Sequence, residues 1–174
     1  GLDNGISNTI NDVSYRSYKH FKMEGMKFPD FKVVDLDGVE YDNQKLKGKL
    51  TLVKTWFVNC KPCIAEMPEL NELVKRHKND EKIQFLSLAK DAKPKLLDFL
   101  QKQEFEYIVI AEQNELIRDK LNIKVSPTHL VVDANGKIEK VFNKASELIS
   151  YLEKDEYFKE TEQKITPPAP PTSR

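Results

Sequence analysis

The sequence has few cysteines, no long apolar run and no excess of either charge. Only two cysteines occur in 174 residues, and lysine plus arginine equals aspartate plus glutamate at 28 each. No apolar run approaches the roughly 20 residues of a membrane-spanning helix, and no signal peptide is visible. The balanced charge provides no general attraction for nucleic acid or anionic lipid. These absences argue against a nucleic-acid-binding or membrane-spanning protein.

The composition is typical of one globular domain, because 39% of the residues are hydrophobic and 32% are charged. Residue 1 is glycine rather than methionine, so we expect a processed or trimmed chain. That expectation permits an export signal or a membrane anchor upstream of residue 1.

Cys60 and Cys63 stand two residues apart, at the junction of an apolar run and a helical pattern. A structural zinc site usually needs four ligands, but the chain has no second cysteine pair, and its histidines, His20, His77 and His129, are scattered. A bridge that closes a four-residue loop removes little entropy from the unfolded chain, so it would stabilise the fold weakly. Two cysteines could also lie close together by chance as small core residues. That alternative would not explain their position between a strand and a helix. The pair therefore predicts a redox-active dithiol.

The position of the pair assigns different roles to the two thiols. Cys60 lies nearest the helix N-terminus, where unpaired N–H groups favour a thiolate, so we expect it to be the exposed nucleophile. Cys63 then resolves the mixed disulfide. Lys61 adds a positive charge that would tune the thiolate, although it is equally consistent with a solvated surface lysine. Pro62 restrains the loop and also suits an early helical position.

Alternating and helical apolar patterns predict an α/β fold, in which a central mixed sheet is flanked by helices and preceded by an N-terminal β-hairpin. A helix from Ile64 to near Asn79 should be kinked by Pro68. The other predicted elements are a hairpin at 31–41, strands at 50–57, 83–88, 107–110, 128–133 and 137–142, and helices at 94–103, 115–121 and 145–154.

The domain organisation has three predicted parts. Residues 1–25 form a peripheral lead-in without a sustained period, and residues 26–157 form the folded domain. Residues 158–174 are a proline-rich tail that cannot join a core and is expected to be disordered.

Several short motifs together resemble the thioredoxin superfamily over roughly residues 26–154. They are Trp56 four residues before Cys60, the Cys60–Cys63 motif itself, Pro68 and the segment Val125–Thr128. The segments Phe28–Phe31, Leu46–Lys49 and Glu66–Pro68 are similar to those of the TlpA/ResA-like thiol-disulfide oxidoreductases, which are typically exported to the bacterial envelope.

The resemblance implies further site residues. Pro127 resembles the cis-proline that lies beside the cysteines, keeps metal away and, with Ser126, offers backbone to a substrate; local sequence alone would favour an ordinary trans proline at a strand start. Trp56 would cover the thiols, or it is a plain core aromatic. Glu66 would tune the cysteines and pass protons, or it is an exposed helix glutamate paired with a nearby cation.

Lys54 departs from the pattern of thioredoxins, which carry a buried acid at this position. If Lys54 is buried, it would bias a cysteine toward thiolate, and if it points outward, it is only a cation that reaches solvent. His129 lies on a strand just after Pro127, where we expect a surface histidine rather than a metal ligand. His77 is expected to be a core histidine at a helix edge.

The sequence thus predicts a monomeric thiol-disulfide oxidoreductase with no bound cofactor. The resemblance implies protein thiol or disulfide substrates and a membrane thiol electron donor. It also implies a place in the bacterial periplasm or cell envelope and a task in cytochrome c maturation or related thiol reduction. A peroxiredoxin is an alternative, but Phe57 occupies the position where its threonine or serine is required. A thiolate copper carrier is another.

Overall fold

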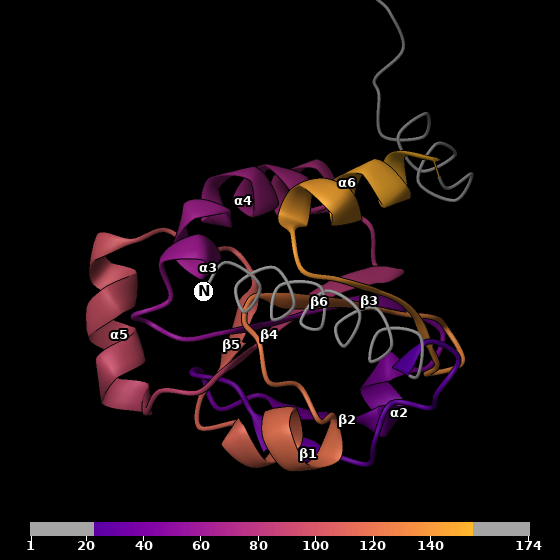
Figure 1. Ribbon diagram of the computed structural model, residues 1–174, viewed down its shortest axis with the longest axis horizontal. Coiled ribbons are helices and arrows are strands. Elements are labelled where there is room, and N and C mark those ends of the chain that lie inside the picture. The colour runs from indigo at the N-terminus through magenta and orange to yellow at the C-terminus, as the bar shows by residue number, and fades with distance from the viewer. Residues whose placement is uncertain (1–22, 155–174) are drawn as a thin grey trace, which may run out of the picture.

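The computed structural model describes residues 23–154, which form a five-stranded sheet with helices on both faces (Figure 1). The strand order is β5-β4-β3-β6-β7. The first three strands in this order run parallel, whereas β6 and β7 are antiparallel to their neighbours. The predicted mixed sheet is confirmed. The strands are β3 (Leu50–Trp56), β4 (Ile83–Ala89), β5 (Ile108–Ile110), β6 (Thr128–Val132) and β7 (Ile138–Phe142).

The predicted hairpin forms a separate two-stranded antiparallel sheet, made of β1 (Lys32–Val34) and β2 (Glu40–Asp42). Its turn contains Gly38 with φ of +87°, a conformation that residues with a Cβ rarely adopt. The backbone N–H of Leu36 donates to the carbonyl of Val109 at 3.2 Å, which joins the hairpin to β5.

The helices cover the two faces of the sheet unequally. In Figure 1, α4 and α6 lie side by side on one face, while the hairpin and the π-helix η1 lie on the other. The helices are α2 (Asn43–Leu46), α3 (Lys61–Ala65), α4 (Met67–Arg76), α5 (Lys93–Lys102), η1 (Glu115–Lys120) and α6 (Ala145–Lys154).

The central strand β3 is buried along both faces, so its side chains alternate between two cores. Leu52 packs in the core beneath α4 and α6, together with Leu70 and Leu148. Val53 packs in the core on the opposite face, with Ile117 of η1. Because alternate residues share a face, Lys54 points to the same side as Leu52.

Three local features differ from the sequence-based prediction. The single kinked helix is instead two helices, α3 and α4, with Glu66 between them. Pro68 lies in the first turn of α4 and has no N–H to donate to the carbonyl of Ile64, which explains the break. The short helix α2 was not predicted; it begins after Asp42, whose carboxylate caps it. The predicted helix at 115–121 has π-helical bonding.

The described end of the lead-in is attached to the sheet. Met23 packs in the core, and the N–H of Gly25 donates to the carbonyl of Ile138 at 2.6 Å. Residues 1–22 and the proline-rich tail lie outside the described residues, so the domain boundaries stay predictions.

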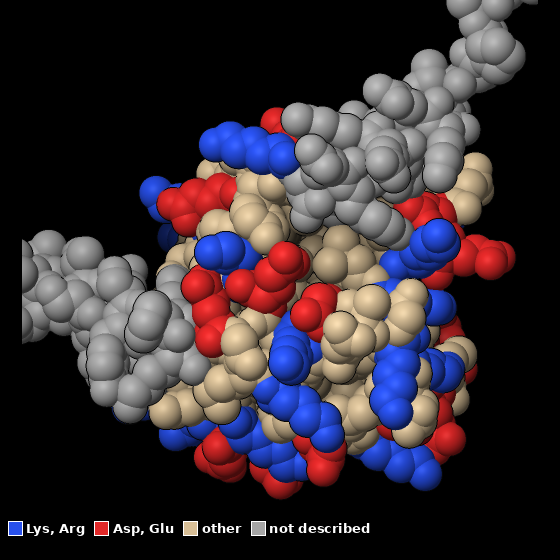
Figure 2. All heavy atoms as spheres, turned by 90° about the vertical axis from the view of Figure 1, so that its right-hand side faces the viewer, with Lys and Arg blue, Asp and Glu red and all other residues tan. Residues whose placement is uncertain are grey.

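No helix within residues 23–154 is long and apolar enough to cross a bilayer. On the face shown in Figure 2, basic and acidic side chains alternate without a large area of one sign.

Candidate active site

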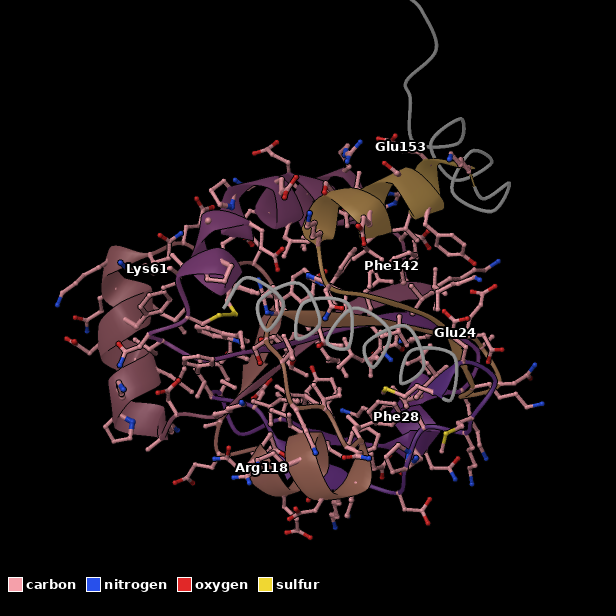
Figure 3. The ribbon with its side chains drawn as sticks, in the orientation of Figure 1. Glu24, Phe28, Lys61, Arg118, Phe142 and Glu153 are labelled. Carbon is pink, nitrogen blue, oxygen red and sulfur yellow. A yellow bond between two sulfur atoms is a disulfide. The ribbon has the colours of Figure 1, made fainter. Side chains whose placement is uncertain are left out.

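The two cysteines form a disulfide at the start of α3, with 5.2 Å between their Cα atoms. The yellow sulfur pair lies just below α3 in Figure 3. Cys60 is the N-cap residue, and its carbonyl accepts the N–H of Ile64 at 3.1 Å. Cys63 is in the first turn of the helix. The predicted dithiol therefore has the geometry that disulfide exchange requires.

Cys60 is less exposed than the sequence suggested. It is 4% exposed, whereas Cys63 is fully buried at 0%. The expectation of an exposed nucleophile is therefore wrong for this oxidised state, although the order of accessibility is as predicted. Both sulfurs lie in an apolar cluster with Trp56 and Met67, which buries them beneath the helix. Lys61 and Pro62 lie on the outer side of the motif and are exposed.

The segment that faces the disulfide contains a cis peptide bond between Ser126 and Pro127, as the resemblance implied. Two elements hold this segment. The hydroxyl oxygen of Thr55, on β3, accepts the N–H of Thr128 at 3.2 Å. The side-chain amide of Asn143, which follows β7, donates to the carbonyl of Pro127 at 3.1 Å and to the Thr128 hydroxyl at 3.3 Å.

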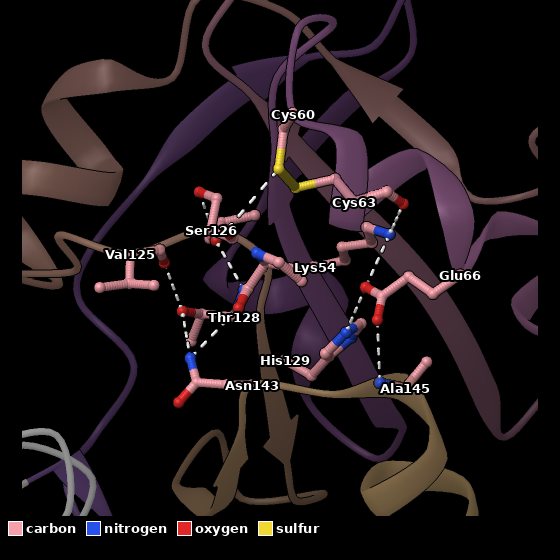
Figure 4. A network of polar contacts seen from close by, with 12 residues as sticks. Lys54, Cys60, Cys63, Glu66, Val125, Ser126, Thr128, His129, Asn143 and Ala145 are labelled. Atoms are coloured by element: carbon pink, nitrogen blue, oxygen red, sulfur yellow. Dashed lines mark hydrogen bonds and ion pairs between the residues drawn. A yellow bond between two sulfur atoms is a disulfide. The ribbon is translucent and has the colours of Figure 1, made fainter. Parts of the chain in front are cut away.

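The backbone before the cis-proline approaches the disulfide closely. The sulfur of Cys60 is 3.6 Å from the carbonyl oxygen of Ser126 (Figure 4). A disulfide sulfur has no proton to donate, but a reduced Cys60 thiol at this position could donate a weak hydrogen bond to that oxygen. The roles of Ser126 and Pro127 in substrate binding stay predictions.

Trp56 is a core residue in this structure. Its side chain is 0% exposed, and its ring packs against Phe99 at 5.5 Å and Phe105 at 5.4 Å between centroids. It shares the apolar cluster with both cysteines. Trp56 therefore packs on the core side of the cysteines. A direct contact with substrate would require its side chain to become exposed.

Lys54 is buried, which settles the alternative that the sequence left open. Its side chain is 0% exposed, at the centre of β3. The ammonium group donates to the carbonyl of Cys63 at 2.7 Å and to the carboxylate of Glu66 at 2.9 Å. It also lies 5.5 Å from the ring centroid of Phe105. Because α3 ends at Ala65, the Cys63 carbonyl lies near the C-terminal end of this helix, and the Lys54 ammonium group supplies it with a hydrogen-bond donor.

Glu66 is also buried, so it is not the exposed glutamate that the sequence allowed as an alternative. It is 9% exposed and lies at the break between α3 and α4. One carboxylate oxygen contacts both Lys54 and the Nε2 atom of His129, the latter at 2.7 Å. The other accepts the N–H of Ala145, the first residue of α6, at 3.0 Å. Its catalytic role stays a prediction.

The prediction of a surface histidine at position 129 is wrong, because His129 is 1% exposed. It lies on β6, directly opposite Lys54 of β3, and β6 is covered on both faces. The three apolar residues after it, Leu130, Val131 and Val132, were a sequence signal for such a strand. His77 is buried at the end of α4, as predicted.

Burial and pairing act against each other in this cluster. Burial lowers the pKa of Lys54, and Glu66 offsets that effect only in part. Burial would raise the pKa of Glu66, but the hydrogen bonds from His129 and Lys54 and the charge of Lys54 outweigh it and hold that pKa below its usual value. Burial lowers the pKa of His129 despite its bond to Glu66. At neutral pH the cluster therefore holds a carboxylate and a neutral imidazole.

Two contributors to the site were missed from the sequence. Asp91 follows β4, and its carboxylate accepts the N–H of Val58 at 2.7 Å, just before the cysteine motif. Asn143 holds the cis-proline segment, as described above. Both are single polar residues at strand ends, where polar residues are common, so only the fold distinguishes them. Within residues 23–154, no group of three or more histidine, cysteine or acidic side chains could hold a metal ion.

Comparisons with known proteins agree with this site. The family model described as Redoxin matches residues 23–156. Thiol-disulfide oxidoreductase ResA of Bacillus cereus (strain ATCC 10987 / NRS 248) is 30% identical over 137 residues, which cover 76% of this chain and 79% of ResA.

Two solved structures from Chlorobium tepidum also match. One, described as thiol:disulfide interchange protein DsbE, has a TM-score of 0.67 at 20% identity and covers 80% of this chain and 97% of its own. The other, a thiol:disulfide interchange protein of the thioredoxin family, has a TM-score of 0.59 at 27% identity and covers 68% and 86%. The protein thus belongs to the Redoxin family, as a ResA-like thiol-disulfide oxidoreductase with Cys60 and Cys63 as its redox pair.

Proposed function

We propose that the protein is a reductase of protein disulfides in the bacterial cell envelope, supplied with electrons by a membrane thiol carrier. It serves cytochrome c maturation or a related thiol-reduction task and acts as a monomer. It needs no bound cofactor, because the Cys60–Cys63 pair itself carries two electrons.

The reaction follows from the two thiols. In the reduced protein, the Cys60 thiolate attacks one sulfur of a substrate disulfide and releases the other as a thiolate, which leaves a mixed disulfide. The Cys63 thiolate then attacks the Cys60 sulfur, so the Cys60–Cys63 disulfide forms and the substrate leaves with both thiols reduced. A dithiol carrier restores the starting state by the reverse exchange.

The observation that carries this proposal is the position of the Ser126 carbonyl, 3.6 Å from the Cys60 sulfur and one residue before the cis-proline. An extended substrate segment that pairs with this backbone would place its own disulfide next to Cys60. Ser126 and Pro127 are therefore the proposed substrate-binding residues, and Trp56 supports the surface from inside.

The charges around the pair support reduction rather than oxidation. A strong oxidant is one whose reduced thiolate form is strongly stabilised. Here the positive charge of Lys54 is balanced by the carboxylate of Glu66 at 2.9 Å, so the thiolate gains only moderate stabilisation. Lys61 is exposed to solvent, where screening weakens its influence.

The envelope location and the cytochrome task rest on the resemblance to TlpA/ResA-like oxidoreductases. A fitting substrate is the disulfide that the two haem-attaching cysteines of a C-x-x-C-H segment can form. Such a segment is short, so it suits recognition through the backbone.

The reduction potential of the Cys60–Cys63 pair tests the direction of electron flow. The protein is equilibrated in a dithiothreitol series, and free thiols are counted by alkylation and mass spectrometry. A two-electron couple near thioredoxin's value of about −270 mV supports the proposal, whereas a value near about −120 mV marks an oxidant and contradicts it.

The substrate is tested with an oxidised C-x-x-C-H peptide and the reduced protein under single-turnover conditions. Reduction of this peptide faster than a scrambled peptide with the same cysteine spacing supports the cytochrome task. Equal rates would point to a general disulfide reductase. Tight stoichiometric copper(I) binding without peptide turnover would favour the copper carrier instead.

A further inference from the structure

A line of hydrogen bonds runs from the resolving cysteine into the core (Figure 4). The Cys63 carbonyl accepts from Lys54, Lys54 donates to Glu66, and Glu66 contacts His129. The three charged or titratable side chains come from β3, the α3–α4 junction and β6, and the sheet and α6 bury them. Lys54 stands between Cys63 and the carboxylate.

Glu66 is poorly suited to take a proton from Cys63. Its two oxygens already accept three hydrogen bonds, from Lys54, His129 and the N–H of Ala145. Each of these donors stabilises the carboxylate, and together they lower its pKa. Glu66 is therefore a fixed counter-ion rather than a base that exchanges protons at neutral pH.

The hydrogen bonding of His129 supports the same assignment. Its Nδ1 atom is buried and has no hydrogen-bond partner among the residues that the structure describes. Because a protonated Nδ1 would be a buried donor without an acceptor, the favoured form carries its proton on Nε2 and donates it to Glu66. His129 thus holds the carboxylate in place without adding charge.

We propose that Lys54 activates the resolving cysteine: its buried ammonium group stabilises the Cys63 thiolate by charge, and Glu66 and His129 act as positioning residues that hold this ammonium group in place. The proposal rests on thiol-disulfide exchange between Cys60 and Cys63, which is part of the proposed function. It does not depend on the direction of electron flow or on the identity of the substrate. In this mechanism Glu66 takes no proton from Cys63. The thiolate is instead stabilised by the charge of Lys54, an electrostatic effect that is strong in a buried site.

The step balances without a further reactant. Cys63 loses its proton to solvent when the reduced protein equilibrates, and the thiolate belongs to the residue whose backbone carbonyl accepts the hydrogen bond from Lys54. When Cys60 is joined to a substrate sulfur, the Cys63 thiolate forms a bond to the Cys60 sulfur. The bond between Cys60 and the substrate breaks, and the substrate sulfur leaves as a thiolate.

Other titratable groups near the cluster are few in the described part of the chain. Glu69 of α4 acts on Lys54 and His129 through its charge. Tyr107, before β5, is buried, and its pKa is raised by burial and by Glu66, so it stays neutral. The net effect on the Cys63 thiolate thus depends on the positive charge of Lys54 and on the opposing negative charges of Glu66 and Glu69.

The test measures the resolving step alone. The reduced protein is mixed with excess Ellman's reagent, which forms a mixed disulfide at Cys60, and the second nitrothiobenzoate ion appears when Cys63 attacks. Stopped-flow recording of this release over a pH series gives a midpoint for ionisation of the attacking thiol. The variants are Lys54→Met, Glu66→Gln, the double variant and, as a matched control, Lys47→Met, which changes an exposed lysine after α2.

We expect Lys54→Met to move the midpoint up by about one pH unit or more, because the buried positive charge that contacts the Cys63 carbonyl is lost. Glu66→Gln should move it down by a similar amount, about one unit, because the opposing charge is lost. The double variant should return close to the wild-type midpoint, and Lys47→Met should not move it.

The opposite signs separate this mechanism from simple damage to the fold. A purely structural role for Lys54 would lower the rate at every pH and leave the midpoint unchanged, which would overturn the proposal. An upward shift in Glu66→Gln would overturn it too, since the carboxylate would then favour the thiolate instead of opposing it. If Lys54→Met does not fold, Glu66→Gln and the double variant, compared with each other, still measure the effect of Lys54. A failure of the reductase proposal would leave these midpoints unaffected.

Discussion

Lys54 and His129 lie directly opposite each other on neighbouring antiparallel strands, and one carboxylate oxygen of Glu66 contacts both side chains. The register of β3 and β6 therefore places a cation and an imidazole side by side inside the core. Both point toward the helices that cover the sheet, where the break between α3 and α4 supplies the carboxylate.

Loss of one partner from this cluster should destabilise the fold strongly. Lys54→Met leaves the buried Glu66 carboxylate without its cation, so we expect the free energy of unfolding to fall by about 3–5 kcal/mol. Urea denaturation followed by circular dichroism measures it. The double variant with Glu66→Gln removes both charges and should be less destabilised than Lys54→Met alone. Additive losses from the two changes would contradict the pairing.

Stability should fall in mild acid because of His129. Its pKa is lowered in the folded state, so the unfolded chain binds a proton that the folded protein does not. The stabilisation is complete above the unfolded pKa of about 6.5 and is lost as pH falls below it, with a slope of up to about 1.4 kcal/mol per pH unit.

The variant His129→Gln keeps a donor for Glu66 but cannot titrate. Its urea-unfolding free energy should therefore change less than that of the wild type between pH 6.5 and the start of Glu66 protonation. The loss associated with Glu66 follows at lower pH, since the pKa of Glu66 is also lowered in the folded state. Identical pH profiles for the two proteins would show that His129 does not contribute.

A buried asparagine holds the segment beneath the site. The side chain of Asn71, on α4, donates to the carbonyl of Glu104 at 3.0 Å and accepts the N–H of Glu106 at 2.8 Å. The segment between them carries Phe105, which packs on Trp56. We expect Asn71→Ala to lower the free energy of unfolding by about 2 kcal/mol, because it breaks two buried hydrogen bonds.

The control for this change is Glu72→Ala, one residue further along α4. Glu72 is exposed, and its ion pair with Lys75 at 3.9 Å lies at the surface. Its substitution should change stability by no more than about 0.5 kcal/mol. Equal effects of the two substitutions, read from urea midpoints, would show that the Asn71 bonds carry no special weight.

The division of labour between the two cysteines is directly testable. Cys63→Ser should accumulate a stable mixed disulfide with an oxidised peptide, because Cys60 can still attack but nothing resolves the product. Cys60→Ser should form far less of it, since the remaining thiol is fully buried. Intact-protein mass spectrometry distinguishes the adducts. Equal trapping by both variants would contradict the assignment.

Much of the fold could be predicted from local patterns. The strand Leu50–Trp56 and the helix Ala145–Lys154 carry strong apolar periods, and both were placed within a residue. Pro68 was correctly predicted to disturb the helix, but as a kink in one helix and not as the boundary of two. The turn at Asp37–Gly38 could also be predicted from local sequence, because it requires only that one residue, Gly38, adopts a positive φ.

The polar part of the site was harder to predict. Glu66 is buried because α6 begins beside it. Ala145, where α6 starts, is 79 positions further along the chain, so the residues near Glu66 do not predict this contact. Lys54 carried a usable signal, since it interrupts an apolar strand predicted to be buried on both faces. His129 was misplaced because the polar residues Thr128 and His129 at the start of β6 were given more weight than the three apolar residues that follow them.

The cis-proline segment is fixed before any substrate arrives. Bonds from Thr55 on one side and Asn143 on the other hold Thr128 and Pro127 through groups of the protein itself. A peptide that pairs with Ser126 then gives up only its own conformational freedom, since the protein side of the contact is already ordered. Recognition through such a preordered edge can remain weak enough for rapid release yet still align two sulfurs for exchange.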